Sequence, residues 1–148
     1  MLYVWKAHPN PIGRDHPWNQ PPTNEKLNEE WVEFVNNAAQ PIDLTGFTLH
    51  DYTFHAQCVK SGERELQSYT GTLASGYSIR VHTGSGQIYN AGSIWHFFLN
   101  RDNFVWNNAC GDYVVLRQNT NLHDWARYEP NPPDGVILTR VAGTNLLR

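Results

Sequence analysis

Short segments of alternating apolar and polar residues, each ended by turn-forming residues, recur along this chain. In residues 29–36, EEWVEFVN, Val32 and Phe34 lie on one face of an extended strand and their neighbours on the other. Segments of the same kind are residues 46–51, 76–83, 112–118 and 124–129. No stretch of about a dozen residues keeps the 3.6-residue apolar period of a helix. The sequence therefore predicts an all-β fold.

Several short strands separated by turns favour a sandwich or barrel. One core between two sheets is expected to hold Val32, Phe34, Phe47, Leu49, Tyr77, Ile79, Val81, Val114 and Leu116. Residues 94–99, IWHFFL, are apolar on both faces, so periodicity leaves a buried strand and a short helical turn open. The tail, residues 130–148, is expected either to add an edge strand or to lead onward.

The length and charge of the chain limit the classes of function. The 148 residues suggest one domain, 1–148. A net charge of −3 argues against an overall electrostatic attraction to nucleic acid, although a local basic patch stays open. The chain has no run of about 18 apolar residues, so no membrane-spanning helix is predicted. No signal peptide is evident, and the localisation is left unknown.

Residues 105–116, VWNNACGDYVVL, hold the densest group of reactive residue types. Asn107, Asn108, Gly111 and Asp112 are all turn-forming residues, because Asn and Asp bond their own backbone and Gly accepts a positive φ. A structural turn that feeds a strand is therefore predicted here. Cys110 is not expected to be a nucleophile, since no helix start or suitably placed histidine is evident to lower its pKa.

Five segments stand in the order NEEWVEFVN, IDLTGFTLHD, YTF, TLASGYSIRVHTGSG and VWNNACGDYVVLRQNTNLHDWARY. In this order they resemble the lamin tail domain family, from about Asn28 to Tyr128. The resemblance implies an immunoglobulin-like β-sandwich without known catalytic machinery. In lamins such domains bind proteins and DNA, and bacterial members often accompany hydrolases as accessory modules. The chain departs from the family pattern in two decorations, the proline-rich residues 8–28 and residues 55–69.

The two cysteines invite comparison with the disulfide that bridges the sheets of immunoglobulin domains. Cys58 lies in the second decoration, and its spacing from Cys110 differs from that motif. The preferred interpretation of Cys110 is a buried, inert thiol. A disulfide between Cys58 and Cys110 is the alternative.

No motif for enzymatic chemistry is present. The seven histidines lack the close spacing of a metal site, and no glycine-rich phosphate loop occurs. We therefore predict no catalytic residue, no metal and no cofactor.

Aromatic residues make up 13% of the chain, and six of them are tryptophans, which is a high number for one sandwich core. The candidate partner-binding residues are Trp18, Tyr69, Trp125 and Arg127. The preferred function is a non-catalytic accessory or localisation module that binds a protein partner, with the oligomeric state left open. The alternatives are a carbohydrate-binding module and a weak DNA-binding domain. Tight DNA binding is not expected unless Arg80, Arg117 and Arg127 converge.

Overall fold

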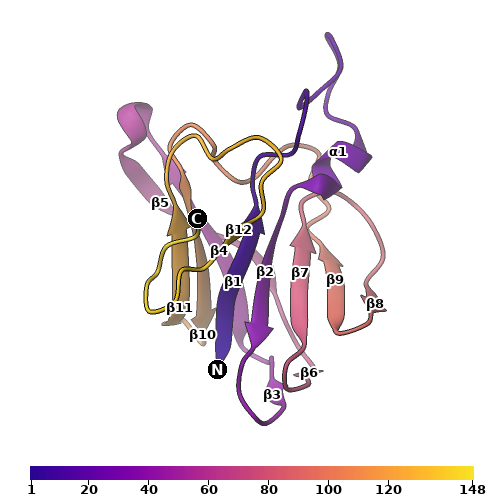
Figure 1. Cartoon of the computed structure of the whole chain (residues 1–148), viewed down its shortest axis with the longest axis vertical. Coiled ribbons are helices and arrows are strands. Elements are labelled where there is room, and N and C mark those ends of the chain that lie inside the picture. The colour runs from indigo at the N-terminus through magenta and orange to yellow at the C-terminus, as the bar shows by residue number, and fades with distance from the viewer.

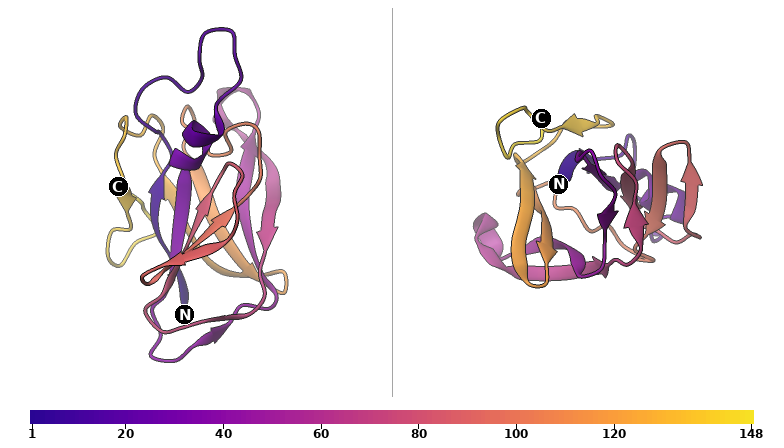
Figure 2. Two further views of the ribbon diagram at one scale, coloured as in Figure 1. Left: turned by 90° about the vertical axis from the view of Figure 1, so that its right-hand side faces the viewer. Right: turned by 90° about the horizontal axis from the view of Figure 1, so that it is seen from below.

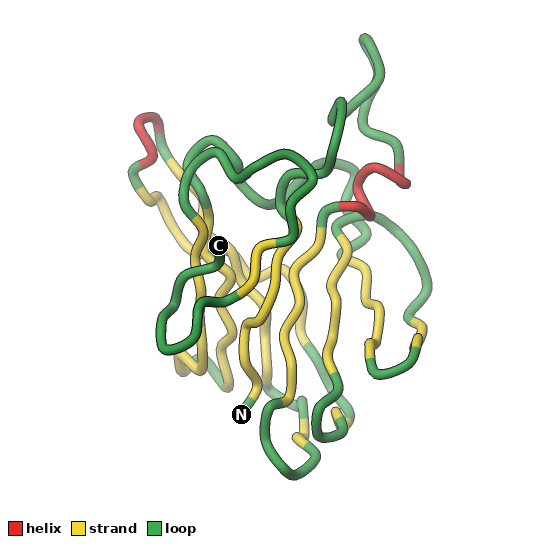
Figure 3. The backbone as a smooth tube through the Cα atoms, viewed as in Figure 1, coloured by secondary structure: helices red, strands yellow, loops and turns green.

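Two β-sheets packed face to face make up most of the molecule, as the computed structural model of residues 1–148 shows (Figure 1). The strands are β1 Leu2–His8, β2 Trp31–Asn36, β3 Ile42–Asp43, β4 Phe47–Phe54, β5 Lys60–Ser68, β6 Thr72–Leu73, β7 Ser78–His82, β8 Tyr89–Ala91, β9 Ile94–Phe98, β10 Asp112–Gln118, β11 Asn121–Tyr128 and β12 Leu138–Thr139. The helical elements are α1, Asn24–Glu29, and the 3₁₀ turn η1, Ala56–Cys58. Strands far outnumber helices, and loops connect them, as Figure 3 shows. The all-β, immunoglobulin-like sandwich predicted from the sequence is confirmed.

The first sheet has the strand order β12-β1-β2-β7-β9-β8, and the second has the order β11-β10-β4-β5. Neighbouring strands are antiparallel except for β7 and β9, which are parallel. The view from below in Figure 2 shows the two sheets enclosing the interior. A third, two-stranded pair, β3 with β6, lies at one end.

The core between the sheets contains the residues that alternation placed there. All nine expected core residues except Tyr77 are buried, and Tyr77 is half-buried and packs against the same cluster. Leu2 and Val4 of β1 and Trp106 before β10 belong to the same apolar cluster of 19 buried residues. Burial of apolar surface of this kind is the main favourable term in folding.

The outward face of β2 is also covered, which alternation alone does not predict. Trp31 and Glu33 are both buried although they point away from the core. The Arg80 guanidinium on β7 lies 4.0 Å from the Trp31 ring centroid, and its Nε donates to Glu33 at 2.7 Å. Arg80 thus covers the aromatic ring and neutralises the carboxylate at once.

Three segments left open or unassigned by the sequence have definite structures. Residues 94–98 form the strand β9, and the tail adds β12 to the edge of β1. The proline-rich decoration ends in the one-and-a-half-turn helix α1, capped by the Thr23 hydroxyl, which accepts from the Lys26 N–H. Six residues are too few to show a helical period, so the sequence does not predict this helix. Neither helical element is long and apolar enough to cross a membrane.

The buried carboxyl of Glu30 makes the stability of the fold depend on pH. One of its oxygens accepts from the Thr83 hydroxyl at 2.6 Å and from the Val105 N–H at 2.9 Å, and no cation pairs with it. Burial raises the pKa of Glu30 from 4.5 to about 8. The folded protein therefore keeps a proton that the unfolded chain releases, and the stability falls as the pH rises from 4.5 towards 8.

We expect Glu30→Gln to remove this pH dependence. Between pH 5 and pH 7 the wild type should lose about 2 kcal/mol of unfolding free energy relative to the variant. Urea unfolding at intervals across that range measures the difference between the two proteins, so a constant cost of the substitution cancels. If the difference in unfolding free energy between the wild type and Glu30→Gln stayed constant from pH 5 to pH 7, Glu30 would not hold a proton in the folded protein.

Candidate functional site

A hollow on the outer face of the second sheet gathers aromatic rings and cations. Its volume is about 310 Å³. The hollow is lined by Tyr52, Lys60, Tyr113, Val115, Arg117, Leu122, Trp125 and Arg127. We call it the aromatic hollow.

The strand register explains why these side chains meet. On β10, Tyr113, Val115 and Arg117 alternate with the core residues Val114 and Leu116, so they point outward. On β11, Arg127 stands opposite Tyr113 and Trp125 stands opposite Val115. Val115 is only 2% exposed even though it faces outward, because it lies beneath the larger side chains and forms the floor.

Three rings with a cation over them form one wall. The Tyr52 and Tyr113 centroids lie 5.1 Å apart with an edge-to-face tilt, and Tyr113 lies 5.9 Å from Trp125. The Lys60 ammonium lies 3.8 Å from the Tyr113 centroid and 4.6 Å from that of Tyr52. The negative face of an aromatic ring attracts a cation, so both rings hold this ammonium in place.

The charges around the aromatic hollow differ in how far they are neutralised. Arg117 donates from two nitrogens to the Glu63 carboxylate, one of them at 2.8 Å, and these hydrogen bonds lower the pKa of Glu63. Glu63 also lies 3.0 Å from Nδ1 of His50, whose pKa burial lowers. Arg127 pairs with Glu129 at a largely exposed position. Lys60 forms no ion pair, and no carboxylate lines the aromatic hollow.

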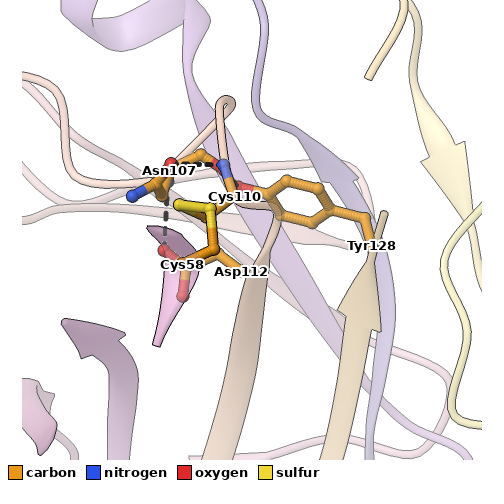
Figure 4. Close-up of a disulfide and its surroundings, with 5 residues drawn as sticks. All are labelled: Cys58, Asn107, Cys110, Asp112 and Tyr128. Carbon is orange, nitrogen blue, oxygen red and sulfur yellow. Dashed lines mark hydrogen bonds between the residues drawn. A yellow bond between two sulfur atoms is a disulfide. The ribbon is translucent and has the colours of Figure 1, made fainter. Parts of the chain in front are cut away.

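A disulfide joins Cys58, which lies between β4 and β5, to Cys110 in the turn before β10 (Figure 4). The preferred sequence interpretation, a buried free thiol at Cys110, is therefore wrong, because Cys110 is bonded to Cys58 and is itself only half-buried. The β4–β5 hairpin carries Cys58 at its tip, in η1, to within 5.3 Å (Cα to Cα) of Cys110. Lys60 follows two residues later, so the bridge anchors the chain next to it.

The turn before β10 connects this disulfide to the strands β4 and β10, which carry Tyr52 and Tyr113. The Cys110 N–H donates to the Asn107 side chain at 2.9 Å. The Asp112 carboxylate accepts from the N–H groups of Asn107, Tyr52 and Tyr113 at 3.0, 3.2 and 2.8 Å. Burial raises the pKa of Asp112 to about 7 against these donors. Asp112 thus ties together the strands that carry two of the three rings.

The remaining turn residues fill backbone roles. Gly111 has a φ of +70°, which favours glycine. The carbonyl of Asn108 accepts from the Asn131 N–H at 2.7 Å, which joins the turn to the proline-rich segment after β11. The Asp112 carboxylate accepts hydrogen bonds from backbone N–H groups, and the Cys110 sulfur is bonded to Cys58. The turn therefore contains no pair of a nucleophile and a base. No group of three or more His, Cys, Asp or Glu side chains is placed to hold a metal ion.

The structure separates the four candidate partner-binding residues. Trp125 and Arg127 line the aromatic hollow. Tyr69 lies in the core instead, 3% exposed, because it packs edge-on against Phe34 and Phe97. Its side chain offers no partner surface, which corrects that assignment. Trp18 is 77% exposed and does not line the aromatic hollow.

Trp18 belongs to a separate surface. It stands in the loop between β1 and α1, which projects from one end of the sandwich (Figure 1). Its neighbours around a shallow polar hollow are Arg14, Asp15, His16, Asn19 and Gln20. With most of its surface in solvent, Trp18 does not plug the end of the core.

Tyr52, Lys60 and Tyr113 were not among the binding residues predicted from the sequence. The alternation around residues 112–118 placed Tyr113 on the outward face, which was the one available signal. Tyr52 and Lys60 join it only through the pairing of β4 with β10 and with β5. Arg117 and Arg127 meet in the aromatic hollow, whereas Arg80 lies on the first sheet against Trp31.

The comparison with known proteins agrees with this architecture. The family model described as Lamin Tail Domain matches residues 16–130. No curated protein matches the chain. The match begins within the proline-rich decoration and spans residues 55–69, so it is wider than the resemblance recognised from residue 28 to residue 128. The chain thus belongs to the lamin tail domain family.

Proposed function

We propose that this chain is a non-catalytic interaction module that binds a segment of a protein partner in the aromatic hollow. The observation that carries the proposal is the outward cluster of Tyr52, Tyr113 and Trp125, which are only partly covered and lie side by side on rigid strands. Most large rings of a sandwich are needed in its core, and grouped rings at a surface are typical of binding sites. Tyrosine, tryptophan and arginine are also the residues most enriched at binding hot spots.

The polar surroundings support a binding role over catalysis. The acidic groups that contact the residues of the aromatic hollow, Glu63, Asp112 and Glu129, all accept hydrogen bonds from donors of the protein itself. Asp112 is fully buried and Glu63 is held by Arg117, so neither carboxyl reaches a ligand as a base without breaking contacts within the sheet. The aromatic hollow therefore offers shape, apolar area and positive charge to a bound molecule.

Trp125 provides the test of this function. Random peptides displayed on phage are selected on the folded domain, and the enriched sequences are synthesised. We expect micromolar binding that weakens about tenfold or more in Trp125→Ala, because the substitution removes one ring of the platform. Trp18→Ala is the matched control, since it removes an equally large ring from a different surface and should leave both affinity and melting temperature unchanged.

Two outcomes would contradict the proposed function. One is a selection in which no peptide is enriched over an unrelated sandwich protein. The other is a set of enriched peptides that bind Trp125→Ala as tightly as the wild type. If Trp18→Ala abolished binding instead, the loop between β1 and α1 would be the binding surface.

A further inference from the structure

We propose that the aromatic hollow selects an acidic segment, in which a carboxylate pairs with Lys60 and a neighbouring apolar side chain packs on the rings. The inference rests on the proposed function and adds the chemistry of the partner. Lys60 is the starting point, because its ammonium lies over two rings and forms no ion pair within the chain.

The position of Lys60 suits an anchor for an anion. Contact with the faces of Tyr52 and Tyr113 orders the long side chain and removes part of its hydration, but it leaves the formal charge in place. A carboxylate that arrives there gains a charge-assisted hydrogen bond without paying the full entropy of ordering a lysine. The rings beside the ammonium bury the apolar part of the same ligand.

The other lining groups point to the same sign of charge. All charged side chains that line the aromatic hollow are cations, and none is an acid. Arg117 and Arg127 are already paired with Glu63 and Glu129, so Lys60 supplies the unpaired charge. A basic peptide would be repelled. A neutral sugar needs hydrogen-bond acceptors as well as donors for its hydroxyl groups. The carboxylates beside the aromatic hollow are already engaged, Glu63 by Arg117 and His50, and Glu129 by Arg127.

A peptide fits the charges better than a nucleic acid strand. Binding to phosphates draws on several unpaired cations along one face. Here Arg117 is neutralised by Glu63, Arg127 is paired with Glu129, and the whole chain carries a charge of −3. Of the three cations that line the aromatic hollow, only Lys60 is unpaired. A single unpaired cation suits a ligand with one carboxylate beside an apolar group. A hollow of about 310 Å³ also fits a pair of side chains more than an extended strand.

The experiment compares defined probes by fluorescence anisotropy. The acidic probe is a labelled peptide of about a dozen residues in which Glu and Phe are spaced by Gly and Ser. The second probe replaces every Glu by Gln, and the third is an oligothymidine of similar length. We expect the acidic probe to bind about tenfold more tightly than the Gln probe at low salt, with the difference shrinking as salt is added.

Lys60→Gln should erase the preference for the acidic probe, whereas Lys60→Arg should keep most of it. Lys6→Gln is the matched control, because Lys6 also lies over an aromatic ring, 3.9 Å from the Trp5 centroid, but on the first sheet. It should leave the affinity unchanged. Lys60 is exposed and unpaired, so its substitution should not unfold the protein, and a thermal melt verifies this.

The results separate this inference from the proposed function. Equal binding of the acidic and Gln probes, or unchanged binding in Lys60→Gln, overturns the inference. Tighter, Lys60-dependent binding of the oligothymidine overturns it in favour of a nucleic acid. If selected peptides need Trp125 but carry no acidic residue, the proposed function stands and the acidic preference is wrong.

Discussion

Substituting Gly111 by Ala is expected to lower the free energy of unfolding by about 4 kcal/mol or more. Gly111 has a φ of +70°, and a residue with a Cβ pays roughly 1–2 kcal/mol for that conformation. A Cβ built there would also lie 2.2 Å from the carbonyl oxygen of Tyr128 and 3.0 Å from the carbonyl carbon of Glu129. These are backbone atoms of the neighbouring β11 strand end, so they cannot turn aside as a side chain would.

Gly76→Ala is the matched control for Gly111→Ala. Gly76 has a similar φ of +76°, but nothing lies within 4 Å of the position of its Cβ. It should therefore lose only the conformational cost, roughly 1–2 kcal/mol. Urea unfolding followed by tryptophan fluorescence measures both variants. Equal losses for the two variants would show that the turn relaxes around the added methyl group and that the close approach to β11 is not needed.

The interior of the fold follows closely from the sequence, because burial imposes a two-residue period on each strand. Phe34, Ile79 and Leu116 could be assigned to the core from their immediate neighbours alone. The same logic fails where a second layer covers the outer face. Trp31 and Glu33 are buried because Arg80, 47 residues beyond Glu33, reaches across from the next strand. Contacts of such long range leave no local signal.

The candidate site follows from the sequence only in part, for the same reason. Trp125 and Arg127 were found because they alternate on one strand. Lys60 was missed because residues 60–68 have no apolar alternation, since β5 is an exposed edge strand paired only with β4. Tyr69 was misplaced because it directly follows this polar strand and yet turns into the core. Its position depends on the pairing at the open end of the β4–β5 hairpin, where the Tyr69 N–H donates to the Phe47 carbonyl at 3.0 Å, and residue types do not reveal this.

Replacing both cysteines by serine is expected to lower the free energy of unfolding by about 4 kcal/mol. The disulfide closes a loop across a sequence separation of 52 residues, and an unfolded chain without that link gains about this much conformational entropy. Wild-type protein treated with a thiol reductant should lose a similar amount. The measurement is urea unfolding of the oxidised, the reduced and the doubly substituted protein under the same conditions.

The same variant also tests whether the bridge positions Lys60, the residue that we propose binds the carboxylate of the ligand. Cys58 is exposed at the tip of the β4–β5 hairpin, and Gln57 and Cys58 both have positive φ values, so without the bridge to Cys110 this tip is free to leave its conformation. Lys60 would then no longer be held over Tyr52 and Tyr113, and the preference for the acidic probe should fall towards that of Lys60→Gln. Combining the cysteine substitutions with Lys60→Gln should cause little further loss, because both act on the same contact. Additive losses would mean that the disulfide stabilises the sandwich without positioning Lys60.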